Sequence, residues 1–124
     1  MKILLVEDSK FLRAATARAL IDAGYEVISA CDGDQALTLA QSQNPALILL
    51  DIMLPKMSGP DVLKALKKDA ATAGIPVMML TSLSQRNAGQ LEKDGASSFY
   101  EKSDSMLGKG SDSLIAAVDR MLKK

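Results

Sequence analysis

The chain contains no histidine among its 124 residues. This absence excludes zinc sites built on histidine, Ser-His-Asp catalytic triads and phosphohistidine carriers. Cysteine is almost absent as well, since Cys31 is the single one. One cysteine cannot form an internal disulfide, and this composition is typical of proteins of the reducing cytosol.

Net charge and long apolar runs are also missing. Lys plus Arg and Asp plus Glu number 15 each, whereas a nucleic-acid surface usually carries a basic excess. No apolar run approaches the roughly 20 residues of a membrane-spanning helix. The acidic pair Glu7–Asp8 follows the first apolar run too early for a signal peptide. We therefore expect one cytoplasmic domain over residues 1–124, which binds neither nucleic acid nor membranes.

Short apolar runs alternate with amphipathic stretches along the whole chain. Strands are predicted at residues 2–6, 25–30, 46–51, 75–80 and 97–101, and helices at about 9–23, 32–43, 61–68, 83–93 and 111–122. The apolar face of the first helix is predicted from its spacing to contain Phe11, Leu12, Ala15, Ala19, Leu20 and Ala23. Five strand–helix repeats favour a parallel sheet with right-handed crossovers.

The order of the strands follows from their hydrophobicity. The first, third and fourth runs are apolar without interruption, as in strands that helices cover on both faces. The second and fifth are interrupted by polar residues and suit the edges. These features predict a doubly wound α/β fold of the flavodoxin-like type, with five helices and the strand order 2-1-3-4-5.

Three acidic residues follow the strands that flank the switch point of this fold. Glu7 and Asp8 end the first strand and Asp51 ends the third. Each acid alone would be an ordinary turn or helix cap. Together they need a cation, and an oxygen-only ligand set suits Mg2+. The predicted ligands are Asp8 and Asp51 directly, Glu7 through water, and the backbone carbonyl of Met53.

Two further polar residues end the neighbouring strands. Thr81 follows the fourth apolar run and Lys102 follows the fifth. In isolation, a threonine there bonds to local backbone and a lysine there is solvated. Beside Asp51 they would supply a hydroxyl donor and a cation for an anionic oxygen. A nucleophilic carboxylate, a metal, a hydroxyl and a cation are the components needed to receive a phosphoryl group.

On these residues the chain resembles the receiver domain of two-component response regulators. The matching segments are Ile3–Ser9, Leu49–Pro55 with Met57–Gly59, Met79–Ser82, and Gly95–Ala96 leading to Phe99 and Lys102. The resemblance implies that Asp51 accepts phosphate from a phosphohistidine of a histidine kinase or phosphotransfer protein. It also implies Mg2+ at Glu7 and Asp8, phosphoryl contacts from Thr81 and Lys102, a switch aromatic at Phe99, and a small residue at Ser82 that leaves room for phosphate.

The chain departs from the family pattern after the fifth strand. The family usually has Lys-Pro with a cis bond where this chain has Lys102–Ser103. A cis bond before serine costs about 2.5–4 kcal/mol, so we expect a trans bond, and the sequence leaves the direction of Lys102 open. The loop 103–110 is also long for the family.

We therefore expect a stand-alone phosphorylation switch that catalyses only its own phosphorylation and dephosphorylation. Its output would be a changed protein-binding surface on the fourth helix, fifth strand and fifth helix, with an unknown downstream protein. The alternative is a receiver-fold binding module that acts without phosphorylation. An aspartyl phosphatase would need a second carboxylate where Met53 stands, and Glu7–Asp8 would repel the phosphate of a flavin.

The lifetime of the phosphorylated state depends on access of water to phosphorus. Met53 lies two residues after Asp51, and Leu83 lies two after Thr81. Neither apolar side chain can orient water by hydrogen bonding, and both can exclude it. These residues predict a long-lived phosphorylated state, unless they pack away and leave the path open.

Overall fold

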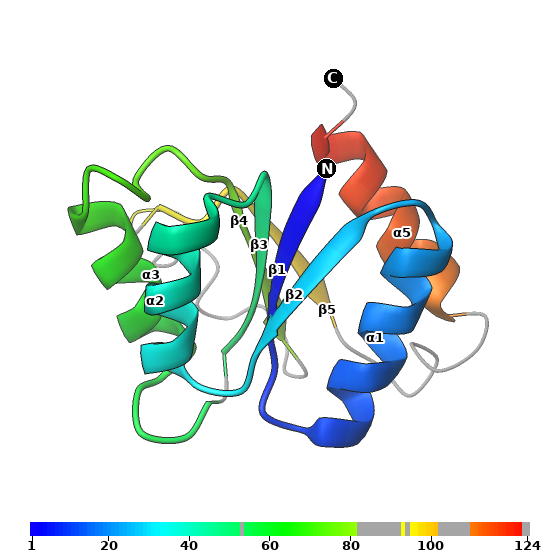
Figure 1. The fold of residues 1–124 in the computed structure, drawn as a ribbon, viewed down its shortest axis with the longest axis horizontal. Coiled ribbons are helices and arrows are strands. Elements are labelled where there is room, and N and C mark those ends of the chain that lie inside the picture. The colour runs from blue at the N-terminus through cyan, green and yellow to red at the C-terminus, as the bar shows by residue number, and fades with distance from the viewer. Residues whose placement is uncertain (53, 82–92, 94, 102–109, 123–124) are drawn as a thin grey trace.

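A parallel sheet lies between two layers of helices in the computed structural model, which describes residues 1–52, 54–81, 93, 95–101 and 110–122 (Figure 1). The strands are β1 (Lys2–Val6), β2 (Glu26–Ala30), β3 (Leu47–Asp51), β4 (Val77–Thr81) and β5 (Ser98–Glu101). The described helices are α1 (Lys10–Asp22), α2 (Gly33–Gln43), α3 (Gly59–Lys68) and α5 (Gly110–Leu122). None of these helices combines the length and hydropathy needed to cross a bilayer.

The five strands lie in the order β2-β1-β3-β4-β5, and every neighbouring pair is parallel. This confirms the predicted order, with the most apolar strands in the centre. Val6 of β1 is in register with Leu50 of β3, and Asp51 is in register with Leu80 of β4. The ends of β1, β3 and β4 therefore lie side by side at the carboxyl edge of the sheet.

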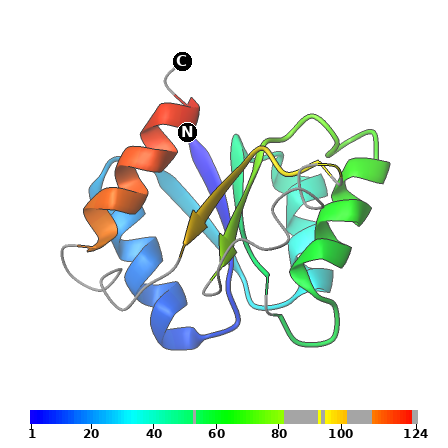
Figure 2. The same cartoon turned by 180° about the vertical axis from the view of Figure 1, so that it is seen from behind.

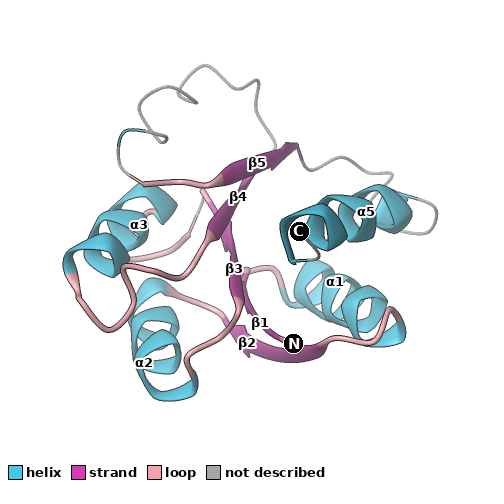
Figure 3. Ribbon diagram, turned by 90° about the horizontal axis from the view of Figure 1, so that it is seen from above, coloured by secondary structure: helices cyan, strands magenta, loops and turns pink. Residues whose placement is uncertain are grey.

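Each face of the sheet has its own hydrophobic cluster. Alternate residues of β1 point to opposite sides, so Leu4 and Val6 pack in one cluster while Ile3 and Leu5 pack in the other. Viewed along the sheet, α2 and α3 cover the first face and α1 and α5 cover the second (Figures 2 and 3). Covering on both faces explains why the central strands are apolar at every position except Lys2, Asp51 and Thr81 at their ends.

Polar side chains fix the starts of three helices. Ser9, Asp32 and Ser58 each accept a hydrogen bond from the backbone N–H three residues later. The α3 helix begins at Gly59, two residues earlier than predicted, because Pro60 suits the first turn of a helix. The β4 strand begins at Val77, after Pro76, rather than at residue 75.

The predicted apolar face of α1 is wrong at its two ends. Phe11 is 68% exposed and Ala23 is also exposed, whereas Thr16 and Leu20 are buried. The buried stripe passes through residues 16 and 20, and it extends back one turn to residues 12 and 13 rather than to 11. Helical spacing alone does not reveal which of two adjacent stripes meets the sheet.

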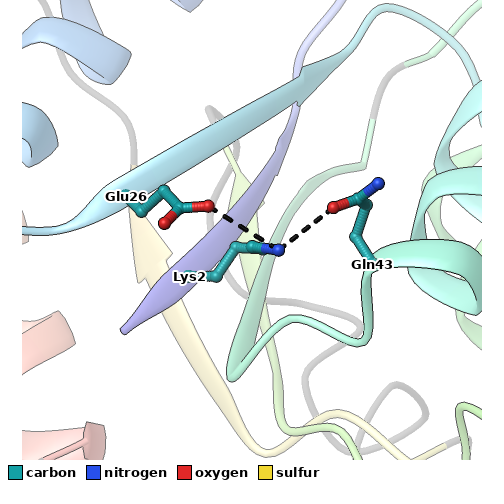
Figure 4. Close-up of polar contacts among 3 residues, drawn as sticks. All are labelled: Lys2, Glu26 and Gln43. Carbon is teal, nitrogen blue, oxygen red and sulfur yellow. Dashed lines mark hydrogen bonds and ion pairs between the residues drawn. The ribbon is translucent and has the colours of Figure 1, made fainter.

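Side-chain contacts also join distant segments. At the amino edge, Lys2 Nζ bonds to Gln43 Oε1 at 3.0 Å and pairs with Glu26 Oε2 at 3.6 Å (Figure 4). Tyr25 directly precedes β2. On the α1–α5 face, its hydroxyl donates to Asp119 Oδ1 in α5. The predicted helix at 83–93 lies outside the described residues, apart from residue 93.

Candidate functional site

Three carboxylates meet where β1 and β3 end, as the strand order predicts. Glu7, Asp8 and Asp51 each place one carboxylate oxygen so that all three lie within 4.8 Å of one another. The side chains of Glu7 and Asp51 are only 3% and 4% exposed, whereas Asp8 is exposed. Two acids of the group are therefore removed from water, and the third opens the site to solvent.

Main-chain contacts hold the segment that carries Glu7 and Asp8. The Glu7 N–H donates to Ala30 O at 3.0 Å, which extends the pairing of β1 with β2 by one residue. On the other side, Arg13 Nη1 donates to Glu7 O at 2.8 Å and to Asp8 O at 3.3 Å. Only three residues separate β1 from α1, so these contacts restrict most of the connection.

The segment after Asp51 is held in a similar way. The Ile52 N–H donates to Leu80 O at 3.1 Å, and the Gly59 N–H donates to Ile52 O at 2.9 Å. Gly59 approaches the main chain of Asp51 and Ile52 so closely that an added Cβ would lie 2.6 Å from Ile52 Cα. The start of α3 is thereby pressed against the end of β3.

The geometry of the three acids fits Mg2+. Ligands of an octahedral Mg2+ lie at 2.0–2.1 Å, so opposite ligand oxygens are about 4.2 Å apart. The oxygens of this group lie within 4.8 Å of one another, so one such ion could contact them after small side-chain movements. Three carboxylates so close together repel one another, and a hard divalent cation removes that repulsion.

The other predicted site residues are described only in part. Thr81 is the last residue of β4, one position beyond the partner of Asp51, so its main chain lies at the same edge. Phe99 lies in β5, opposite Met79, and is half-buried against the α2–α3 cluster. Met53, Ser82, Leu83, Lys102, the Lys102–Ser103 bond and the loop up to residue 109 lie outside the described residues. Within the described part of the chain there is no cis peptide bond.

Two residues at the site escaped the prediction from the sequence. Arg13 had no assigned role, although an arginine one turn into a helix that follows an acidic pair is a usable signal. Gly59 was noted only as part of the matching segments. Its close approach to Asp51 depends on the crossing of α3 and β3, which the sequence does not state.

Comparison with known proteins decides the family. The family model "Response regulator receiver domain" matches residues 3–107. The chain belongs to this family. The chemotaxis response regulator CheY4 of Vibrio cholerae superposes with a TM-score of 0.87 at 31% identity over 98% of each chain. The receiver domain of the Francisella response regulator 1452 gives a TM-score of 0.85 at 28% identity, over 98% of this chain and 96% of that one.

The curated relatives of this receiver domain include longer transcriptional regulators. The DNA-binding dual master transcriptional regulator RpaA of Synechocystis is 37% identical over 99% of this chain and 49% of its own length. The alkaline phosphatase synthesis regulator PhoP of Bacillus subtilis is 41% identical over 66% of this chain and 33% of its own length. The chain thus spans a third to a half of the relatives named here. Our expectations of a stand-alone protein and of no nucleic-acid contact stay predictions.

Proposed function

We propose that Asp51 is the phosphoryl acceptor of a signalling switch. The observation that carries this proposal is the group of Glu7, Asp8 and Asp51, with oxygens within 4.8 Å of one another at the carboxyl edge of the sheet. In a parallel α/β sheet this edge is where ligands bind. Membership of the receiver family supports phosphorylation-dependent signalling as the activity of this edge.

The proposed transfer is a substitution at phosphorus. An Asp51 carboxylate oxygen forms the new O–P bond while the bond to the donor breaks, and the donor atom keeps the electron pair. The donor is a phosphohistidine of a histidine kinase or phosphotransfer protein. Glu7, Asp8, Asp51 and the carbonyl of Met53 would hold Mg2+, which supplies positive charge next to the phosphoryl oxygens. Thr81 and Lys102 would contact the same oxygens.

The proposed output is a change in a protein-binding surface. Thr81 on β4 and Phe99 on β5 belong to adjacent strands, and Phe99 is half-buried. A movement of Thr81 toward the phosphoryl group would leave space for Phe99 to change rotamer. The affected surface would include β5, α5 and the predicted helix at 83–93.

The acceptor is tested with a small acyl phosphate and Mg2+, followed by intact-mass measurement. Wild type should gain the mass of one phosphoryl group, and Asp51→Asn should gain none. Asp61→Asn is the matched control, because Asp61 is an exposed acid in the first turn of α3. Full labelling of Asp51→Asn would refute the assignment. Absence of label on wild type, from both this reagent and kinases, would favour the phosphorylation-independent binding module.

A further inference from the structure

Arg13 lies beside the acidic group but bonds to its main chain. Nη1 of its guanidinium is 2.8 Å from Glu7 O and 3.3 Å from Asp8 O. These two contacts involve carbonyl oxygens, so they do not use the carboxylate oxygens of the same residues. The contact with Glu7 O is partly buried, which limits competition from water, whereas the contact with Asp8 O is exposed.

The position of these carbonyls sets the direction of the acidic side chains. A carbonyl oxygen of residue i can rotate only if the ψ angle of that residue changes. Fixing the carbonyls of Glu7 and Asp8 on one guanidinium therefore restricts the backbone angles that orient their two Cα–Cβ bonds. Both contacts come from the same nitrogen, Nη1, so a single guanidinium position ties the two carbonyls together.

Two other contacts of this connection act on different groups. The Glu7 amide is held by Ala30 O, and Ser9 caps α1 through its hydroxyl, which accepts from Leu12 N at 3.3 Å. Neither contact involves the carbonyl of Glu7 or that of Asp8. Arg13 instead contacts the peptide planes that follow Glu7 and Asp8, through their carbonyl oxygens.

We propose that Arg13 is a positioning residue that holds Glu7 and Asp8 in the geometry required to bind Mg2+. This inference rests on the proposed function of the acids as metal ligands. Some residues do not bind a metal themselves but hydrogen-bond to its ligands and orient them. Replacement of such a residue typically lowers metal affinity by about 10- to 100-fold. The positive charge of Arg13 has the opposite effect, because it repels Mg2+. Replacement of Arg13 should therefore lower Mg2+ affinity if positioning dominates, and raise it if charge dominates.

The test is an Mg2+ titration followed by amide resonances of the full, isotope-labelled chain. We expect Arg13→Ala to weaken Mg2+ binding by about tenfold or more. Arg13→Gln and Arg13→Lys, which keep an N–H donor, should bind with intermediate affinity. The matched control is Arg18→Ala on the same helix, because Arg18 is 83% exposed and its ion pair with Asp22 is far from the acids; its affinity should equal that of wild type.

A second measurement separates positioning from a general loss of stability. The carbonyl 13C resonances of Glu7 and Asp8 should move when Arg13 is replaced by alanine, and urea unfolding gives the folded fraction of each variant. An Arg13→Ala protein that is less stable but binds Mg2+ with wild-type or higher affinity would overturn the proposal. Affinities of Arg13→Gln and Arg13→Ala that both equal or exceed the wild-type value would also overturn it, because loss of charge would then be the only effect.

Failure of this inference can be distinguished from failure of the proposed function. If wild type is phosphorylated on Asp51 and the Arg13 variants bind Mg2+ normally, only the role of Arg13 is rejected. If wild type neither binds Mg2+ nor accepts a phosphoryl group, the function of the site is rejected, and the role of Arg13 with it.

Discussion

Gly59, the first residue of α3, lies directly against the main-chain carbonyl of Asp51. A Cβ at position 59 would overlap that carbonyl oxygen and would lie 2.6 Å from Ile52 Cα. Both atoms belong to the backbone and cannot rotate away as a side chain does. A side chain at position 59 would therefore displace the segment that carries the proposed acceptor.

Gly59→Ala should lower the free energy of unfolding by about 1–3 kcal/mol, because the added methyl group forces backbone apart. It should also reduce labelling of Asp51 by an acyl phosphate. The matched control is Gly74→Ala, where an added Cβ meets no atom within 4 Å. That variant should be stabilised slightly, by at most about 1 kcal/mol, through a less flexible unfolded chain. Equal urea midpoints for the two variants would contradict the contact seen here.

Removal of one acid should separate metal binding from folding. Asp8→Asn keeps the size of the side chain but removes one of three neighbouring charges, so Mg2+ should bind more weakly and stabilise the fold less. The thermal midpoint is measured with and without excess Mg2+, and phosphorylation is measured in the same solutions. A chelator should abolish labelling of wild type. Undiminished labelling under chelation would show that the acids serve another purpose.

The different exposure of two residues on α1 predicts unequal effects of their substitution on stability. Leu20 is fully buried against the α1–α5 side of the sheet, so Leu20→Ala should cost about 2–5 kcal/mol of unfolding free energy. Phe11 is 68% exposed, and Phe11→Ala should change the free energy of unfolding by no more than about 0.5 kcal/mol. Urea unfolding checks both. A large loss for Phe11→Ala would mean that the apolar face predicted from the spacing of α1 was right.

Tyr25 should make stability depend on alkaline pH. Its burial first, and then its hydrogen bond to Asp119, raise the pKa of Tyr25 from 10.0 to about 12. The folded-state pKa lies above the unfolded value. The contribution of Tyr25 to the free energy of unfolding is therefore complete below about pH 10 and is lost as the pH rises toward about 12.

The measurement compares urea unfolding of wild type and Tyr25→Phe near pH 8 and near pH 11. Near pH 8 the variant should be less stable by about 1 kcal/mol, since it lacks the hydrogen bond. Near pH 11 the difference should shrink. A difference that stays constant would show that the hydroxyl does not titrate above its usual range in the folded chain.

The lifetime prediction from Met53 and Leu83 is tested by the decay of label on Asp51. Met53→Asn with Leu83→Glu supplies polar groups that can orient an attacking water, so the double variant should lose its label faster than wild type. A matched control is Leu54→Asn, which places the same amide next to position 53 in the chain. Decay of the double variant at the wild-type rate would refute the shielding hypothesis.

The sequence predicted those features that depend on burial of whole strands. Apolar runs at β1, β3 and β4 indicated the strand order, and this order brought Glu7 and Asp51 to one edge. The sequence did not predict contacts that depend on the crossing of two elements. Arg13 reaches back over a three-residue connection, and Tyr25 meets Asp119 across 94 positions. Such pairs leave no periodic pattern, because a single polar contact needs only one residue on each element.

Every strand of the sheet runs in the same direction, and this has a practical consequence for attachment of the protein. The chain enters β1 at the amino edge, and the acids follow only after the strand has crossed the sheet (Figure 1). A five-residue strand is about 17 Å long. A tag or surface linker joined at Met1 would therefore be held away from the acids. Immobilisation through that end should leave a phosphodonor free to approach, which makes it the better choice for binding measurements on a sensor surface.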